Sequence, residues 1–213
     1  MPEVYIHHAG ACVLGCEDGP EINDLKAAVS RSARRRMTRT ALMIHHSLGD
    51  IDLSKFDTIV YQTAYSEVQT VEKYIDGFPH PSPLQFQVSI HPSGAEQVLI
   101  DRKCSVRQFY PLADLGAPLP ALRCLSRLGG EGLLIFAEEE GSWLAEKGLA
   151  SESSFAASLS VSPLRDGAIG RIHWRDRFGC PSEEDTFSFV QAIRKRRPLS
   201  LRSDRFELNL EWF

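Results

Sequence analysis

A continuous apolar run, Leu133–Ala137, most constrains what this chain can fold into. It lies between Gly132 and three consecutive glutamates, Glu138–Glu140. Strands that are buried on both faces have such unbroken runs, whereas strands with one face in solvent alternate apolar and polar residues. The run therefore predicts a central strand that is covered by helices on both sides.

Strand and helix patterns alternate along the rest of the chain. Period-two or β-branched segments predict strands at Val4–His8, Asp57–Gln62, Phe86–Ile90, Val106–Leu112, Phe155–Val161, Ala168–Trp174 and Phe206–Phe213. Apolar residues three and four apart predict helices at Ala33–Leu48, Val68–Gly77, Ser93–Ile100, Pro118–Leu128 and Phe187–Arg194. We expect one α/β domain over residues 1–213, with a layered α-β-α arrangement and a mixed sheet.

Local sequence refines three of these expectations. A proline-broken stretch, Pro79–Pro83, predicts a loop. Ser93 is expected to cap the helix that follows it. The strands Phe155–Val161 and Ala168–Trp174 are expected to pair with each other through a turn at Arg165–Gly167.

Composition favours a cytoplasmic protein. The 213 residues are 43% hydrophobic and 24% charged, and the formal net charge of −4 gives no reason to expect a nucleic acid or an anionic membrane as partner. No apolar run approaches the roughly 20 residues of a membrane span. Residues Met1–Gly10 lack the features of a signal peptide, and five scattered cysteines are typical of reduced thiols.

Adjacent histidines and a cationic run are the candidate binding sites in this sequence. His7-His8 and His45-His46 are adjacent pairs whose side chains diverge, so neither pair can chelate one ion, and we expect no metal and no cofactor. The cationic run Arg31–Arg39 has the charge to attract an acidic partner such as a carrier protein or a nucleic acid. Its place on an amphipathic helix favours a solvated or interface-facing helix side.

Motifs for nucleophilic catalysis are absent from the sequence. There is no G-x-S-x-G, and no cysteine stands at a strand-to-helix turn before small residues. Cys104 follows Arg102-Lys103, which predicts a lowered thiol pKa, but no histidine is specified near it. Glu138–Glu140 are expected to face solvent, and Gly129–Gly132 matches no nucleotide-binding pattern.

Several segments between about residues 31 and 138 follow the pattern of a known family. Ser32–Leu42 (S-A-R-R-R-M-T-R-T-A-L), with Thr58–Tyr61 as the strand that follows it, resembles the early helix of the β-ketoacyl synthases. Ser82–Ala95 (S-P-L-Q-F-Q-V-S-I-H-P-S-G-A) is similar to the synthase stretch S-P-x-x-F-x-x-S-x-x-N-x-x-x-G. Gly132–Glu138 looks like the strand that ends in G-G-A-E. The resemblance implies a thiolase-like fold, essentially the N-terminal half of a ketosynthase.

The resemblance also implies that the catalytic residues are missing. The synthase nucleophile elbow, T-A-C-x-x-G, falls at Leu112–Gly116, which puts Asp114 at the approximate position of the catalytic cysteine. An aspartate cannot hold an acyl chain as a stable thioester. The synthases take two further histidines from their second half. Residues 154–213 hold no such pair, and His173 is expected to pack beside Trp174.

Nucleophile-less members of this family are chain-length factors, which dimerise with a synthase. The resemblance is to the shortened type found in aryl polyene and type II polyketide clusters. It implies an active β-ketoacyl synthase as partner, with an acyl carrier protein reached indirectly through the complex. The segment Val106–Leu112 is expected to pair with the synthase across a pseudo-twofold axis. The interface candidates are Val106, Arg107, Phe109, Tyr110 and Leu112.

The resemblance also implies that bulky side chains between Gly77 and Ile90 close the end of the tunnel that holds the acyl chain. The candidates are Phe78, Phe86 and, just beyond, His91. Two alternatives remain open at this point. One is a small hydrolase or thioesterase-like enzyme that uses Asp114 or Cys104 with a histidine. The other is a scaffold that only stabilises the synthase.

Overall fold

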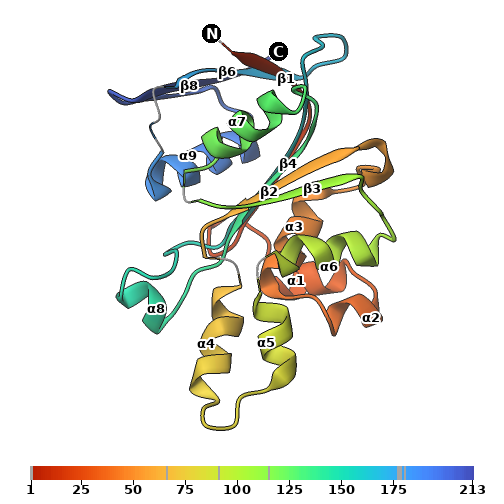
Figure 1. Ribbon diagram of the computed structural model, residues 1–213, viewed down its shortest axis with the longest axis vertical. Helices are drawn as coiled ribbons and strands as arrows, with labels where there is room; N and C mark the ends of the chain where they lie inside the picture. The colour runs from red at the N-terminus through yellow and green to blue at the C-terminus, as the bar shows by residue number, and fades with distance from the viewer. Residues whose placement is uncertain (1, 66, 91, 115, 177–178, 180) are drawn as a thin grey trace.

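A mixed β-sheet runs through the chain (Figure 1). The computed structural model describes residues 2–65, 67–90, 92–114, 116–176, 179 and 181–213. Within them, the eight-stranded sheet has the order β3-β2-β4-β5-β1-β6-β8-β7. The strands are β1 (Glu3–Val13), β2 (Thr58–Thr63), β3 (Gln108–Ala113), β4 (Gly132–Glu138), β5 (Phe155–Ser162), β6 (Gly170–Asp176), β7 (Leu199–Arg202) and β8 (Phe206–Trp212).

Helices cover both faces of this sheet, as Figure 1 shows. On one face lie α7 (Leu119–Arg127) and α9 (Glu183–Arg194); on the other lie α1 (Ile22–Ala27), α2 (Arg31–Arg34), α3 (Arg39–Leu48) and α6 (Ser93–Asp101). The remaining helices are the 3-10 turn Leu53–Lys55, α4 (Val68–Asp76), α5 (Pro83–Ser89) and α8 (Trp143–Glu146). The predicted α-β-α layering with a mixed sheet is confirmed.

β4 is the central strand that its apolar run predicts. Each of its residues is buried, and it pairs with β2 in parallel and with β5 in antiparallel orientation. Successive side chains point to opposite faces. Leu134 and Phe136 therefore pack in the layer of α7 and α9, while Leu133 and Ile135 pack in the layer of α3 and α6.

The expected pairing of β5 with β6 is wrong, because β1 lies between them. Both strands exist, but β5 and β6 each pair with β1 in antiparallel orientation. β1 is also longer than predicted and passes through Gly10. A Cβ at Gly10 would stand 1.9 Å from the carbonyl oxygen of Ser47 on α3, so the strand continues there only because the residue is glycine. The closing strand β7 was not predicted.

The single helix expected over Ala33–Leu48 is two helices. Ser30 Oγ accepts a hydrogen bond from Ala33 N at 3.2 Å, and Thr38 Oγ1 accepts one from Ala41 N at 3.2 Å. Each hydroxyl caps a separate helix start, so the chain breaks between Arg34 and Arg39. The predicted end of the second helix at Gly49 is confirmed.

The extended segment expected at Phe86–Ile90 is helical in the structure. Ser82 precedes α5 and Pro83 occupies its first turn, a favourable place for a proline, and these local preferences outweigh the alternation of apolar and polar residues. Helices α4 and α5 form a hairpin that projects away from the sheet (Figure 1), and we call residues 68–89 the arm. Ser93 is the first residue of α6 and Pro92 is its N-cap, so Ser93 is not the cap.

Candidate functional site

β3 lies at one edge of the sheet and pairs only with β2 among the described strands. Its outer row of backbone N–H and C=O groups therefore faces away from the sheet. Such a row is a template for pairing with another chain. Pro111 lies within β3, and a proline inside a strand is itself a sign of an edge position.

The predicted interface residues lie on or just before this edge. Phe109, Tyr110 and Leu112 belong to β3, whereas Val106 and Arg107 precede it, because β3 begins at Gln108. Phe109 packs toward the layer of α3, and Tyr110 and Leu112 toward the layer of α7. All three remain partly accessible. Neighbouring apolar side chains are thus available on both faces of the edge strand.

Asp114 stands at the turn from β3 into α7. Its backbone N–H donates to the Thr63 carbonyl at 3.2 Å, and its carbonyl accepts from Gln62 Nε2 at 3.1 Å. Its carboxylate Oδ1 accepts from the backbone N–H of Gly116 at 2.9 Å, which closes an Asx turn. The side chain thereby stabilises its own loop.

His173 and Cys104, two residues of the alternative hydrolase reading, differ from their expected surroundings. His173 lies on β6, five strand positions from β3, which corresponds to roughly 24 Å at the usual strand spacing. Its Nδ1 is 3.7 Å from Glu211 Oε1, on the strand face opposite to the buried Trp174, so the expected packing of His173 beside Trp174 is wrong. Burial, assisted by Asp52, raises the pKa of Cys104, contrary to the expected lowering.

Two of the three carboxylates at the end of β4 are buried, whereas all three were expected to face solvent. Glu138 is 5% and Glu139 1% exposed, and only Glu140 reaches solvent. Glu138 accepts hydrogen bonds from Thr63 Oγ1, from the backbone N–H of Tyr65, both at 3.2 Å, and from the backbone N–H of Ala64. Burial outweighs these donors and raises the pKa of Glu138 to about 8.

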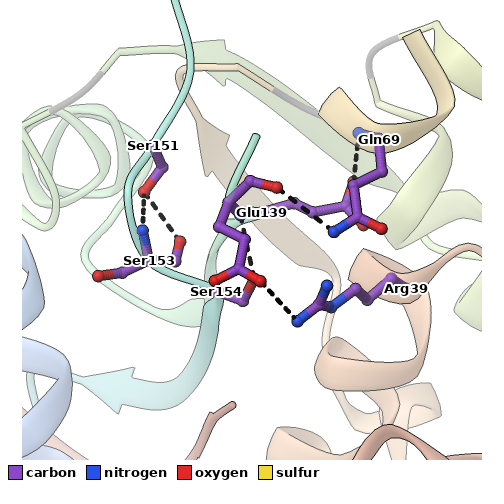
Figure 2. A network of polar contacts seen from close by, with 7 residues as sticks. Arg39, Gln69, Glu139, Ser151, Ser153 and Ser154 are labelled. Carbon is purple, nitrogen blue, oxygen red and sulfur yellow. Dashed lines mark hydrogen bonds and ion pairs between the residues drawn. The ribbon is translucent and has the colours of Figure 1, made fainter. Parts of the chain in front are cut away.

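Glu139 and Glu140 connect the end of β4 to two helices, and Figure 2 shows Glu139 close to Gln69 of α4. Glu139 accepts from the backbone N–H of Gln69, in the first turn of α4, at 3.1 Å, and burial raises the pKa of Glu139 to about 7. Glu140 pairs with Arg39 at the start of α3 at 3.2 Å. Ser154 Oγ accepts from the Glu140 N–H at 3.0 Å. Burial of these carboxylates could have been predicted from their position in the sequence, because they stand at the end of a fully buried strand.

The tunnel candidates Phe78 and Phe86 lie together on the arm. Their rings stand 5.6 and 5.5 Å from the ring of Tyr74, and the two side chains are 62% and 52% exposed. His91 lies outside the described residues. The arm thus presents an aromatic surface that no other described part of the chain covers.

The cationic run lies on α2 and the start of α3. Arg31, Arg34, Arg35 and Arg36 are exposed, and Arg39 is half-buried against Glu140. No group of three or more His, Cys, Asp or Glu residues in the described part of the chain has the geometry of a metal site. Among the same residues, no helix has the length and hydrophobicity to cross a membrane.

Comparison with known proteins gives matches by structure alone. The sequence matches no family model and no curated protein. A chain of "Ketosynthase (ApeO) in Complex with its Chain Length Factor (ApeC)" from Xenorhabdus doucetiae superposes with a TM-score of 0.68 and 16% identity, over 99% of this chain and 100% of that one.

Two further solved structures are similar. A type II polyketide synthase complex of an acyl-carrier protein with its ketosynthase, AntDE:AntF, matches with a TM-score of 0.57 and 12% identity, over 88% of this chain and 72% of that one. A β-ketoacyl synthase from Burkholderia phymatum matches with a TM-score of 0.53 and 12% identity, over 83% and 65%.

The chain therefore has the thiolase-like layered fold of the β-ketoacyl synthases. Within that fold, a chain from a complex of a ketosynthase with its chain-length factor is similar to it from end to end.

Proposed function

We propose that this protein is a non-catalytic subunit of the chain-length-factor type. It pairs with an active β-ketoacyl synthase and shapes the tunnel for the growing acyl chain. One observation carries the proposal: this chain covers 100% of its match in the ketosynthase and chain-length-factor complex, but only 65% of a β-ketoacyl synthase. The matched chain of that complex is thus of similar length.

The environment of Asp114 supports the absence of catalysis. The residue follows β3 on the turn into α7, where the resemblance to the synthases puts the nucleophile, and its carboxylate is bonded to the Gly116 N–H. A carboxylate cannot replace a thiolate in forming the acyl thioester of the condensation reaction. The partner synthase supplies that chemistry, and the acyl carrier protein reaches the complex through the synthase.

The edge strand supports the pairing. β3 offers unpaired backbone groups together with Phe109, Tyr110 and Leu112. The arm adds the exposed Phe78 and Phe86. Obligate protein–protein interfaces bury more than about 2,000 Å² of accessible surface in total, and much of this surface is apolar. β3 and the arm together supply apolar surface of that kind.

Co-purification tests the pairing, and product analysis tests the tunnel. A tagged chain should retain a full-length β-ketoacyl synthase at one-to-one stoichiometry. In the reconstituted complex, Phe86→Ala should lengthen the products, because a smaller side chain moves the tunnel wall outward. Phe213→Ala is the matched control, since Phe213 is a similarly exposed phenylalanine at the end of the sheet distant from the arm.

The outcome separates this role from the scaffold alternative. A scaffold stabilises the synthase without touching the acyl chain. It therefore predicts co-purification with unchanged product lengths for Phe86→Ala. Failure to retain a synthase would overturn both roles.

A further inference from the structure

A cavity of about 860 Å³ lies between the helices on the α3 face of the sheet. Side chains from five helices line this cavity. α1 contributes Lys26, α3 Arg39, α4 Lys73, α5 Leu84 and Val88, and α6 Gln97. We call this cavity the α3 groove. Its walls come from segments far apart in the sequence, which is typical of a preformed ligand site.

Two hydrogen-bond donors that lie buried beside the groove have no acceptor among the described residues. Gln97 Oε1 accepts from the Thr38 N–H at 2.7 Å, which fixes the amide orientation and leaves Nε2 as the inner donor. Gln97 Nε2 and Arg39 Nε are both buried without a hydrogen-bond partner there. Both N–H groups lie beneath the surface of the groove, where their positive partial charges favour an anion above them.

The charge of the lining favours an anion as that acceptor. Five cationic side chains line the groove against two acidic ones, Glu96 and Glu139. The cationic residues are Lys26, Arg35, Arg36, Arg39 and Lys73. Of the two acids, Glu139 is bonded to the N–H of Gln69 in the first turn of α4. Converging cations raise the local concentration of anions and strengthen their hydrogen bonds.

The rest of the groove is apolar. Leu84 and Val88 are one helical turn apart on α5, and Ile100 faces them from α6. Leu84 is 67% and Ile100 68% exposed, so apolar surface lies open inside the groove. Phe86 is absent from the lining and points to the other side of α5, toward Tyr74. The groove is therefore separate from the aromatic surface proposed for the tunnel.

We propose that the α3 groove binds an anionic amphiphile, a linear apolar chain that ends in a carboxylate or a phosphate. The head group pairs with the cationic side chains that line the groove, above Gln97 and Arg39, and the chain lies along Leu84, Val88 and Ile100. This site does not rest on the proposed pairing with a synthase, because every residue that builds it belongs to this chain.

Photoaffinity labelling of the full chain, in whatever complex it purifies, tests the site. A photoreactive dodecanoic acid should label peptides that cover residues 83–101, and the matching photoreactive alcohol should not. Unlabelled dodecanoate, dodecyl phosphate or both should compete with the label. Competition by one of them alone identifies the head group and supports the site. Competition by neither, or equal labelling by the alcohol probe, overturns it.

Variants locate the head group. Gln97→Glu keeps the acceptor for the Thr38 N–H but removes the inner donor and adds a negative charge, so labelling should fall roughly tenfold or more. Lys73→Gln should lower it less, and Lys55→Gln, an exposed lysine outside the groove, should leave it unchanged. If Gln97→Glu does not fold, Arg36→Gln with Lys73→Gln replaces it. Wild-type labelling of a folded variant that lacks these groups overturns the proposal.

Discussion

Glu138 and Glu139 are buried carboxyl groups whose pKa values lie far above that of an exposed glutamate. An unfolded glutamate titrates near 4.3, whereas the folded pKa of Glu138 is about 8 and that of Glu139 about 7. Between these values the folded state binds more protons than the unfolded state. The free energy of unfolding therefore decreases as pH rises through the folded pKa values.

A pH series should reveal this loss of stability. Burial lowers the pKa of His8, His45 and His46, so these histidines add stability as pH rises through about 6.5, where the unfolded histidines lose their protons, and they offset part of the loss only below about pH 7.5. We expect the melting temperature to fall by several degrees between about pH 6.5 and 8.5. Glu138→Gln should flatten that slope in thermal unfolding, because the amide does not ionise.

Glu131→Gln is the control for this series, since Glu131 is exposed and should keep the wild-type slope. Glu138→Gln should also be less stable at pH 6.5, because its amide cannot accept from all three donors that meet the carboxyl group. A slope as steep in Glu138→Gln as in the wild type would contradict the assignment.

Asp114 permits a test that separates folding from catalysis. Asp114→Asn keeps an oxygen for the Gly116 N–H and should leave stability nearly unchanged. Asp114→Ala loses that hydrogen bond, which should cost about 1 kcal/mol. With the partner synthase present, both variants should form product at the wild-type rate. A loss of product formation in the stable Asn variant would restore a catalytic role for this carboxylate.

At the scale of elements, the arm is held to the body by polar contacts more than by apolar packing. Only Val68 and Glu72 of α4 are buried, and no residue of α5 is. The Glu72 carboxylate accepts from Ser142 N at 2.7 Å, Ser142 Oγ at 2.9 Å and Leu144 N at 3.1 Å, which joins α4 to α8. These bonds determine where the arm points.

Removing this anchor should loosen the arm selectively. In Glu72→Ala, three donors near α8 lose their acceptor, so amide hydrogen exchange should speed up in residues 68–89 and 142–146. The strands of the sheet should keep their protection. Asp76→Ala, an exposed acid on the same helix, is the control. Uniformly faster exchange across the sheet would show that Glu72 stabilises the whole domain instead.

Elements with strong local patterns were predictable from the sequence. The buried strand β4, the end of α3 at Gly49 and the short strand β2 follow from apolar runs and a helix-stop residue. The errors have local causes as well. The apolar pattern does not predict the helix starts at Thr38 and Ser82. At Thr38 the capping hydroxyl outweighs the pattern, and after Ser82 the proline in the first turn does so.

Long-range features were beyond the sequence for a physical reason. The sequence of β1 does not indicate that the strand lies between β5 and β6. Pairing between strands far apart in the sequence depends on tertiary packing and not on the residues next to each strand. Burial of Glu138 and Glu139 likewise depends on the loop at Ala64 and on α4, which fold over them. At the candidate interface, the extended segment was predicted to within two residues, but its position at the sheet edge came from the topology.

At the scale of the whole molecule, the sheet has two edges of unequal character. β3 ends it on one side and β7 on the other. Leu112 and Leu199 are partly exposed leucines on these two edges. Lysine on an edge strand opposes pairing with another strand, since its charge would be desolvated. Only one of the two edges carries the candidate interface.

This asymmetry gives a matched pair of variants. Leu112→Lys should abolish retention of the synthase in co-purification, while Leu199→Lys should retain it. Circular dichroism should show both chains folded. Loss of the synthase with both variants would point to general destabilisation, and retention with both would remove β3 from the interface.

The open edge at β3 also has a consequence for the amount of this protein that a cell can make safely. Under the proposed pairing, a chain made in excess of a synthase partner exposes β3 and the aromatic surface of the arm. Unpaired strands of this kind join one another into aggregates or are degraded. The proposed pairing therefore requires balanced synthesis of the two subunits. Recombinant production should follow the same rule, with the yield set by the scarcer partner.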